Sequence, residues 1–307
     1  MPKHQFAVHE VVVRKLNAKK DAERLLHDFT GKGDDLLSVF PEFLKAHVGS
    51  GRACKKNRYI KLISKTVKGR CIWFDVEVGR WGLQGRVIDT TSHSEAYSIR
   101  SQDAPTYVIR GLLVVPETGV RGLMVAEVVS NRSFMSTLWP EFRDWFAGRF
   151  PEAKLWPRES TAVEAPAWLK YLDDAKLQKI TFTSYERSTD QARRVRAREW
   201  VLRGYRGEVL PKDWIGKLVK DRVNPKSVIT DIPSGFNPEE TKVEMNGPGG
   251  PKTVVIQKDY PRFLHELSDD DEPRPDDATF RAAVLSEVRD TLEAMGLDHE
   301  LVLAGAS

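Results

Sequence analysis

Two nearly continuous apolar runs, Tyr107 to Val115 and Gly122 to Val129, limit the folds available to this chain more than any other feature. A Pro-Glu-Thr-Gly turn separates them, so the runs are spaced as the two arms of a hairpin. Strands that are apolar on both sides are covered on both faces. We therefore expect them to be central strands of an internal sheet. Both runs are shorter than the roughly 20 apolar residues that a membrane-spanning helix needs, and no membrane association is expected.

Alternating patterns predict a second hairpin, with strands at Arg58 to Val67 and Cys71 to Val78 around a Lys68-Gly69 turn. In its second strand Trp73, Asp75 and Glu77 point away from the apolar face. Helical spacing predicts helices at 18–29, at 34–44 and at 133–150, the last with a break near Pro140. Residues 1–150 are therefore predicted to form a mainly antiparallel sheet with helices on one side.

The rest of the chain is also predicted to contain both strands and helices. Strands are predicted at Leu177 to Tyr185 and in a hairpin formed by Thr241 to Met245 and Thr253 to Lys258, and a final amphipathic helix at Asp277 to Met295. The predicted class is α+β, with mainly antiparallel sheets and flanking helices in two lobes plus a C-terminal helix. The predicted domains are an N-terminal sheet-and-helix lobe at 1–150, a second α+β lobe with a basic cluster at 151–265, and an acidic tether with an amphipathic helix at 266–307.

The segment Ser188 to Arg203 fits two structures. Ser188 with Gln191 forms a capping box and Gly204 suits a helix end, which favours a helix. A strand would instead place Arg194, Arg196, Arg198 and Trp200 on one face. We expect a helix that gives way to a strand.

Cysteine content and the N-terminus indicate a cytoplasmic protein. The two cysteines, Cys54 and Cys71, match no zinc or redox spacing and are interpreted as ordinary reduced thiols. The N-terminal residues lack an apolar segment long enough for export. No His or Cys spacing matches a metal site, no cofactor is predicted, and no catalytic residue can be assigned.

The net charge of +4 conceals a strong asymmetry along the chain. Between Arg14 and Arg70 there are 15 Lys and Arg against 6 Asp and Glu, and between Arg187 and Lys226 there are 12 against 5. From His265 to Ser307 the balance reverses, with 3 against 12. Such separation concerns the partners of a protein and not its fold.

Each lobe carries one basic cluster that could bind nucleic acid, because Lys and Arg neutralise phosphates and exposed aromatic rings stack on unpaired bases. In the first cluster Tyr59 and Trp73 lie near the basic residues. The alternative interpretation is a solvated surface paired with local carboxylates. The predicted binding residues are Lys55, Lys56, Arg58, Lys61 and Lys65 in the first cluster, and Arg193, Arg194, Arg196, Arg198, Trp200, Arg203 and Arg206 in the second.

Two further classes of function stay open. Asp75 and Glu77, with Lys61 or Lys65 nearby, could hold Mg²⁺ in a metal-dependent nuclease, although such pairs are common on surface strands as cross-strand salt bridges. A protein-interaction adaptor would use the basic and acidic regions to bind a partner with complementary charges.

The predicted function is nucleic-acid interaction, as a sensor or a subunit of a larger complex, with the acidic tail screening the basic surface. The C-terminal helix is the predicted contact for a protein partner or a homodimer.

Overall fold

The computed structural model describes residues 4–15, 23–130, 132–161, 174–187, 195–205, 208–215, 217–218, 228–229, 232–233, 236, 238–247, 250–257, 261–268 and 272–306. The chain divides into two compact units. Unit 1 comprises Met1–Val8 and Ser160–Gly296, and unit 2 comprises His9–Glu159 and Leu297–Ser307. Strand β1 (His4–Lys15) therefore contributes residues to both units.

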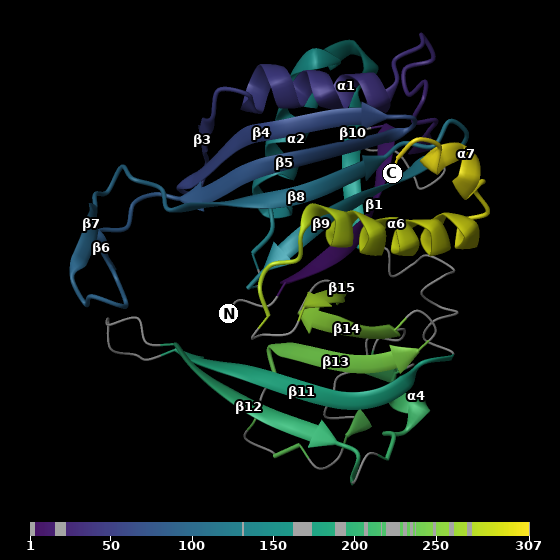
Figure 1. The fold of residues 1–307 in the computed structure, drawn as a ribbon. Helices are drawn as coiled ribbons and strands as arrows, with labels where there is room; N and C mark the ends of the chain where they lie inside the picture. The colour runs from purple at the N-terminus through teal and green to yellow at the C-terminus, as the bar shows by residue number, and fades with distance from the viewer. Residues whose placement is uncertain are drawn as a thin grey trace. The chain divides into compact units, whose positions relative to one another are not determined.

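Unit 2 contains an antiparallel sheet with the strand order β1-β9-β8-β5-β4-β3, and β2 and β10 also pair with β1 (Figure 1). Its strands are β2 (Glu23–Arg24), β3 (Arg52–Cys54), β4 (Arg58–Lys68), β5 (Cys71–Arg80), β6 (Gly85–Ile88), β7 (Glu95–Ile99), β8 (Thr106–Val114), β9 (Arg121–Val129) and β10 (Leu155–Thr161). Its helices are α1 (Leu36–Phe43), the π-helical turn η2 (Leu44–Val48), α2 (Met135–Arg149), the 3₁₀ turn η3 (Pro151–Ala153) and α7 (His299–Leu303). Strands β6 and β7 form a separate two-stranded sheet.

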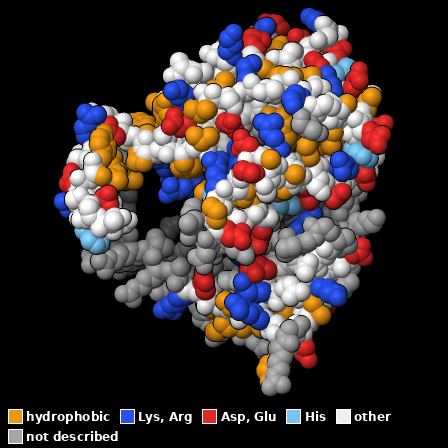
Figure 2. All heavy atoms as spheres, viewed as in Figure 1, with side chains coloured by type: hydrophobic (Ala, Val, Ile, Leu, Met, Phe, Trp, Pro, Cys, Tyr) orange, Lys and Arg blue, Asp and Glu red, His pale blue; other side chains and the backbone are white. Residues whose placement is uncertain are grey.

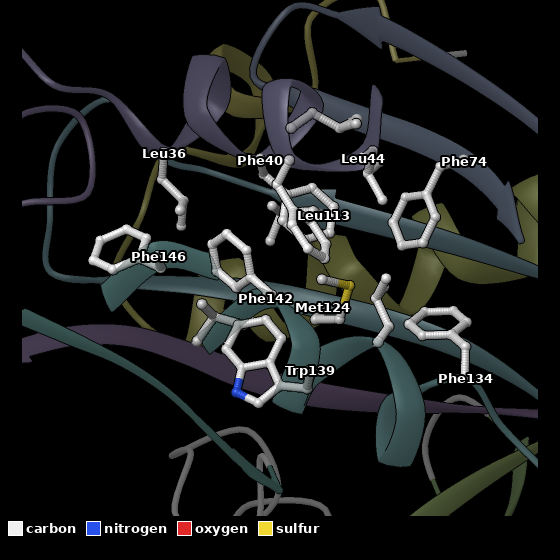
Figure 3. Packing of buried hydrophobic residues seen from close by; sticks show 14 of the residues in the cluster. Leu36, Phe40, Leu44, Phe74, Leu113, Met124, Phe134, Trp139, Phe142 and Phe146 are labelled. Carbon is white, nitrogen blue, oxygen red and sulfur yellow. The ribbon is translucent and has the colours of Figure 1, made fainter. Parts of the chain in front are cut away.

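The core of unit 2 confirms the predicted central hairpin. Its two runs form β8 and β9, in which Leu113 and Met124 are fully buried. Helices α1 and α2 cover one face of the sheet with an aromatic layer (Figure 3). In that layer the ring of Phe40 lies 5.2 Å from Phe142 of α2 and 5.5 Å from Phe74 of β5. Close-packed aromatic pairs of this kind fix how two elements lie against each other.

Asp35 and Arg70 form an ion pair at the N-terminus of α1. Asp35 caps the helix by accepting a hydrogen bond from the Leu37 amide at 2.8 Å. The same carboxylate accepts two hydrogen bonds from the Arg70 guanidinium, at 2.6 and 3.1 Å. Arg70 follows Gly69, whose φ of 53° completes the predicted turn between β4 and β5. Arg70 therefore ties this turn to α1, since a two-pronged Arg–carboxylate pair fixes geometry as well as charge.

Two predictions about helices in unit 2 are wrong. Residues 18–22 of the helix predicted at 18–29 lie outside the described residues, but 23–24 form β2 and 25–29 form turns. Leu26 and Phe29 mimic a helical spacing because the turn inserts both into the core, where the Leu26 amide donates to the Gly119 carbonyl at 3.2 Å. The predicted break near Pro140 is absent, because α2 continues through it.

Unit 1 contains an antiparallel sheet with the order β12-β11-β13-β14-β15-β1. Its further elements are β11 (Lys176–Arg187), β12 (Val195–Arg203), α4 (Lys212–Ile215), β13 (Glu240–Gly247), β14 (Gly250–Gln257), β15 (Pro261–Ser268) and α6 (Asp277–Ala294). The strand expected at the end of the contested segment is confirmed, because 195–203 pair with β11 along their whole length, and the helix expected before it falls on 188–194, which lie outside the described residues. The ring of Trp200 lies 5.7 Å from that of Phe182, and this cross-strand contact favours the strand.

The predicted C-terminal helix is confirmed as α6. Asp276 caps it by accepting from the Thr279 amide at 2.7 Å. Five apolar residues at helical spacing are predicted to form its stripe; Phe280, Val284, Val288 and Leu292 are buried in the folded chain, and Met295, just after the helix, is half-buried. The stripe is thus occupied within the chain, and a homodimer through this helix would need another of its faces. No helix among the described residues is long and apolar enough to cross a membrane.

A buried ionic cluster joins α6 to the sheet of unit 1. Glu287 of α6 accepts hydrogen bonds from the Lys252 ammonium of β14 at 3.0 and 2.8 Å, and its Oε2 lies 3.2 Å from His265 Nδ1 of β15. The His265 ring stacks on Phe6 of β1 with 4.5 Å between centroids. Burial lowers the pKa of His265, and the nearby Glu287 opposes this only in part. His265 is therefore neutral at pH 7 and donates its Nδ1–H to Glu287.

This cluster makes the stability of the chain depend on pH. Below pH 6.5 the unfolded chain protonates His265 whereas the folded chain does not, so the free energy of unfolding should fall as pH falls, by at most about 1.4 kcal/mol per pH unit for one proton. Urea unfolding of the wild type and of His265→Gln at pH 7.5 and 5.5 measures this. The variant should lose less stability between the two pH values. An equal loss in both proteins would show that His265 does not cause it.

Candidate binding cleft

A cleft of about 380 Å³ opens between the short edge strand β3 and helix α2 of unit 2. Three elements line it: the turn η2, the strand β3 with the residue that follows it, and α2. The lining residues are His47, Arg52, Ala53, Cys54, Lys55, Glu141, Asp144 and Trp145. We call it the β3–α2 cleft.

The aromatic layer of the core extends into this cleft. The half-buried ring of Trp145 lies 5.5 Å from Phe43 and is stacked against Phe142 with 6.4 Å between centroids. The imidazole of His47 lies 5.5 Å from Phe43 at an interplanar angle of 30°. Trp145 and His47 are thus held by rings that belong to the core. They give the cleft a preformed aromatic side.

Glu141 is the electrostatic centre of the cleft. Its Oε2 accepts a hydrogen bond from Arg52 Nε at 2.8 Å and lies 3.2 Å from His47 Nε2. Its carboxylate is largely buried, with 11% of the side chain exposed. A buried carboxylate needs such partners to offset its lost hydration. Glu141 thereby fastens β3 and η2 to α2, and it presents a carboxylate and a guanidinium side by side.

Cys54 lies in the cleft as a thiol. Burial and the charge and hydrogen bonding of Glu141 raise its pKa to about 12. The thiolate is the nucleophilic form of cysteine, so a cysteine with this pKa is a poor nucleophile at neutral pH. The arrangement therefore suits binding better than thiol chemistry. Cys71, in β5, is buried, and burial likewise raises its pKa to about 12.

The rim of the cleft carries exposed charges. Lys55 Nζ lies 3.4 Å from Asp144 Oδ2, and 88% and 59% of these side chains are exposed. An ion pair this exposed contributes about 0–1 kcal/mol, so either partner can exchange the other for a ligand. Lys56, which is exposed, follows in the β3–β4 turn with a φ of 62°.

The residues of the first predicted cluster do not form one surface in the structure. Lys55 lines the cleft together with Arg52, and the exposed Lys56 is the next residue in the chain. Arg58 has another role: it donates to the carbonyl of Ser136, whose helical donor is removed by Pro140 four residues later. A carbonyl left without its partner thus finds one in the neighbouring strand, which helps α2 to continue through the proline.

The other members of that cluster lie along β4. Lys61 is opposite Glu77, and Lys65 is opposite Phe74, whose side chain faces the helices. Trp73, predicted as a stacking surface, is buried, and its Nε1 donates to the Ala306 carbonyl at 3.0 Å. That part of the prediction is wrong, because the C-terminal segment of unit 2 covers this ring.

The second predicted cluster is only partly described. Arg193, Arg194 and Arg206 lie outside the described residues, and Arg196 is in β12, where its backbone is opposite that of Glu186. Alternation along β12 puts Arg198 and Trp200 on one face and Arg203 on the other. Trp200 is half-buried and in contact with Phe182, so part of its ring is used in packing. Arg198 and Arg203 are exposed, and Arg198 shares its face of β12 with Trp200.

The predicted nuclease pair has hydroxyl partners. Asp75 accepts a hydrogen bond from Ser64 Oγ at 2.6 Å, and Glu77 accepts one from Thr106 Oγ1 at 2.6 Å. In the described part of the chain no three His, Cys, Asp or Glu side chains group closely enough to hold a metal ion. The described residues therefore provide no metal site that would support the nuclease hypothesis. Screening by the acidic tail stays a prediction, because 269–271 lie outside the described residues.

Sequence reasoning missed the α2 side of the cleft. The aromatic residues of this helix predict a core element and do not indicate a binding site. The available signal was Glu141 and Asp144 at an i, i+3 spacing beside Trp145, which places two carboxylates and an indole on adjacent turns. Their approach to β3 could not be inferred, because it depends on how α2 crosses the sheet.

Comparison of the chain with protein-family models, with curated proteins and with solved structures finds no match. The geometry of the cleft is therefore the basis for inferring a function.

The state of Cys54 gives a direct test of the cleft geometry. In a Cys71→Ser background, which leaves Cys54 as the sole cysteine, iodoacetamide should alkylate it slowly at pH 8, because its pKa of about 12 leaves little thiolate. Glu141→Gln removes the negative charge that raises this pKa and should accelerate alkylation. Glu152→Gln, an exposed site outside the cleft, is the control and should change nothing. An unchanged rate in Glu141→Gln would refute the contact between Cys54 and Glu141.

Proposed function

We propose that this protein binds single-stranded nucleic acid by taking one unpaired base into the β3–α2 cleft. The observation that carries the proposal is the combination, in one cleft, of an aromatic side formed by Trp145 and His47 with the cationic side chains of Arg52 and Lys55, to which the exposed Lys56 is adjacent in the chain. Proteins that bind single strands combine stacking rings with positive charges that follow the backbone.

The size of the cleft favours an unpaired base over a duplex. Sites for small ligands have volumes of about 300–1,000 Å³, and the cleft, at about 380 Å³, is at the lower end of that range. Duplex DNA is read by a helix or a ribbon inserted into a groove. A concave site with an aromatic wall instead suits a base that has left its stack, as in the recognition of loops and ends of RNA.

Each part of the cleft has a role in this proposal. The half-buried indole of Trp145 offers a face for stacking, worth about 1–3 kcal/mol per base. Glu141 supplies an acceptor and Arg52 a donor, so together they can read the polar edge of a base. Lys55 would leave its exposed pair with Asp144 for a phosphate, at little cost because that pair is solvated.

The local charge supports a single-strand contact of modest strength. Lys55 lines the cleft, and Lys45 and Lys56 are exposed close to its lining residues in the sequence, while Asp144 offsets part of their charge. Compensation of this kind weakens a long-range field and leaves the contacts short-ranged. Specificity would then come from the base pocket more than from the backbone.

Replacing the rim lysines should change the salt dependence of binding. For single strands the slope of log K against log salt changes by about 0.7 per neutralised phosphate, so Lys55→Ala with Lys56→Ala should reduce it by about 1.4. Fluorescence anisotropy of a labelled single-stranded oligonucleotide, measured across a salt series, gives the slope. Lys15→Ala with Lys32→Ala is the matched control, because it removes the same charge from exposed residues outside the cleft lining.

The control double variant should retain the wild-type slope. Equal slopes for the two double variants would mean that only net charge matters and would reject the cleft as the binding site. Tighter binding of a duplex than of a single strand of the same sequence would reject the role of an unpaired base.

A further inference from the structure

Arg58, Arg80 and Arg132 lie at the end of the unit 2 sheet where α2 begins. Arg58 of β4 and Arg80 of β5 are cross-strand partners, so their side chains share the face of the sheet that α1 and α2 cover. Arg132 follows β9, and two backbone hydrogen bonds of 2.9 Å join it to Val129. Figure 2 shows Lys and Arg side chains at the surface next to the base of the β6–β7 hairpin, to which β5 leads.

The phenol of Tyr107, in β8, brings two of these arginines together. The Arg132 guanidinium lies over its ring, with 5.6 Å between Cζ and the ring centroid. Burial raises the pKa of Tyr107, whereas the charges of Arg132 and Arg80 lower it, so both guanidinium groups lie near this half-buried side chain. Arg80 and Arg132 are themselves exposed. An aromatic ring under a guanidinium holds the plane of the guanidinium and leaves its donors to solvent.

Carboxylates do not compensate this positive charge. Arg58 donates to the Ser136 carbonyl, and in the described part of the chain neither Arg80 nor Arg132 forms an ion pair with an Asp or a Glu. Other arginines of unit 2 do pair with carboxylates, among them Arg52, Arg70, Arg110 and Arg121. Like charges directly opposite each other on neighbouring strands are destabilising. An anion bound beside Arg58 and Arg80 would remove this repulsion.

The anion that suits this arrangement best is a phosphate group. A guanidinium can donate two parallel hydrogen bonds to one phosphate, and arginine is the side chain preferred for such contacts. Phosphate oxygens lie in more than one plane, so two arginines that come from different strands can each reach some of them. Helix α2, which has no side-chain cap at its start, adds the positive end of its dipole to the charge of the arginines.

The arginines adjoin the β3–α2 cleft. Cys54, which lines the cleft, is the cross-strand partner of Arg58, and the charge of Arg58 acts on its thiol. Trp145 of the cleft follows Ser136 by nine residues of α2. At 1.5 Å per residue this is about 14 Å along the helix. A short single strand with one base in the cleft can therefore lay its backbone on the arginines at the start of α2.

We propose that Arg80 and Arg132 form a site for a phosphate group, and that this group is a backbone phosphate of the strand whose unpaired base enters the cleft. We call the pair the Arg80–Arg132 site. The inference rests on the proposed function, because it assigns a second contact of the same strand. Arg58 stays on the Ser136 carbonyl and contributes charge alone. The site also sets the path of the strand, from the cleft along α2 towards the start of that helix.

Oligonucleotides with one uncharged linkage locate this contact in the full chain. In a set of single strands that each carry one methylphosphonate at a different position, the wild type should bind one member at least about tenfold more weakly, because that member lacks the charge that the arginines hold. Arg80→Ala with Arg132→Ala, the site variant, should bind the unmodified strand about as weakly and lose nothing further with that member. Its slope of log K against log salt should be smaller by about 0.7, the value for one phosphate.

Arg24→Ala with Arg149→Ala is the matched control variant. Both residues are exposed arginines of unit 2, and Arg149 lies over the Phe150 ring with 5.2 Å to its centroid, so the control removes the same charge and a similar ring contact. Fluorescence anisotropy measures binding, and circular dichroism verifies that both variants are folded. The control variant should keep the wild-type response to every linkage. Equal changes in the two variants, or a site variant that still responds to the same linkage as the wild type, would overturn the proposal.

The proposed function and the Arg80–Arg132 site can fail separately. If Trp145→Ala weakens binding of the single strand while the site variant binds like the wild type, the cleft is supported and the Arg80–Arg132 site is rejected. If the wild type binds no oligonucleotide, the proposed function is rejected, and calorimetry with inorganic tripolyphosphate decides on the site. Tripolyphosphate binding that the site variant loses would support a site for free phosphate groups. Absence of that binding would reject the site as well.

Discussion

The aromatic layer between the helices and the sheet of unit 2 determines where this protein can present chemistry. Phe40, Phe74 and Phe142 join α1, α2 and β5, and the same layer continues through Phe43 to Trp145 and His47. Because protein cores are close-packed, such rings have one position each. The β3–α2 cleft is the solvent-exposed end of this layer, so its aromatic side is as rigid as the core behind it.

Several of the arginines in the first basic cluster stabilise the fold and are therefore not available to a ligand. Arg70 caps the start of α1 through Asp35, Arg58 satisfies the carbonyl that Pro140 leaves open, and Arg52 holds the carboxylate of Glu141. Each of these arginines belongs to a stretch that reads in the sequence as a uniform basic surface. What is left for a ligand is the lysine rim, where exposed pairs are weak. The number of Lys and Arg residues in a stretch of sequence therefore overestimates how many of them can bind a ligand.

The sequence predicts the elements of the fold well where one physical rule decides. The apolar runs of β8 and β9, the alternation of β4 and β5, and the spacing of α6 all yield their structures directly. Prediction fails at 23–29, where a turn imitates helical spacing, and it leaves the start of β12 open, because only pairing with β11 defines that strand. Local pattern carries no information about a partner strand that is distant in sequence.

The sequence likewise allows only some of the cleft residues to be predicted. Lys55 and Lys56 could be identified from the sequence because they lie in a basic run. Glu141 and Trp145 could not, because they are 89 or more positions from Arg52 along the chain and meet it only after α2 has packed.

Ultraviolet cross-linking of the full-length protein to a single-stranded oligonucleotide, with the cross-linked peptides identified by mass spectrometry, tests the central claim most directly. The account predicts cross-links at Trp145 or His47 and at residues 52–56, and their loss at salt concentrations that abolish binding. Cross-links confined to β11 and β12, or none at all under conditions in which the oligonucleotide binds, would contradict it.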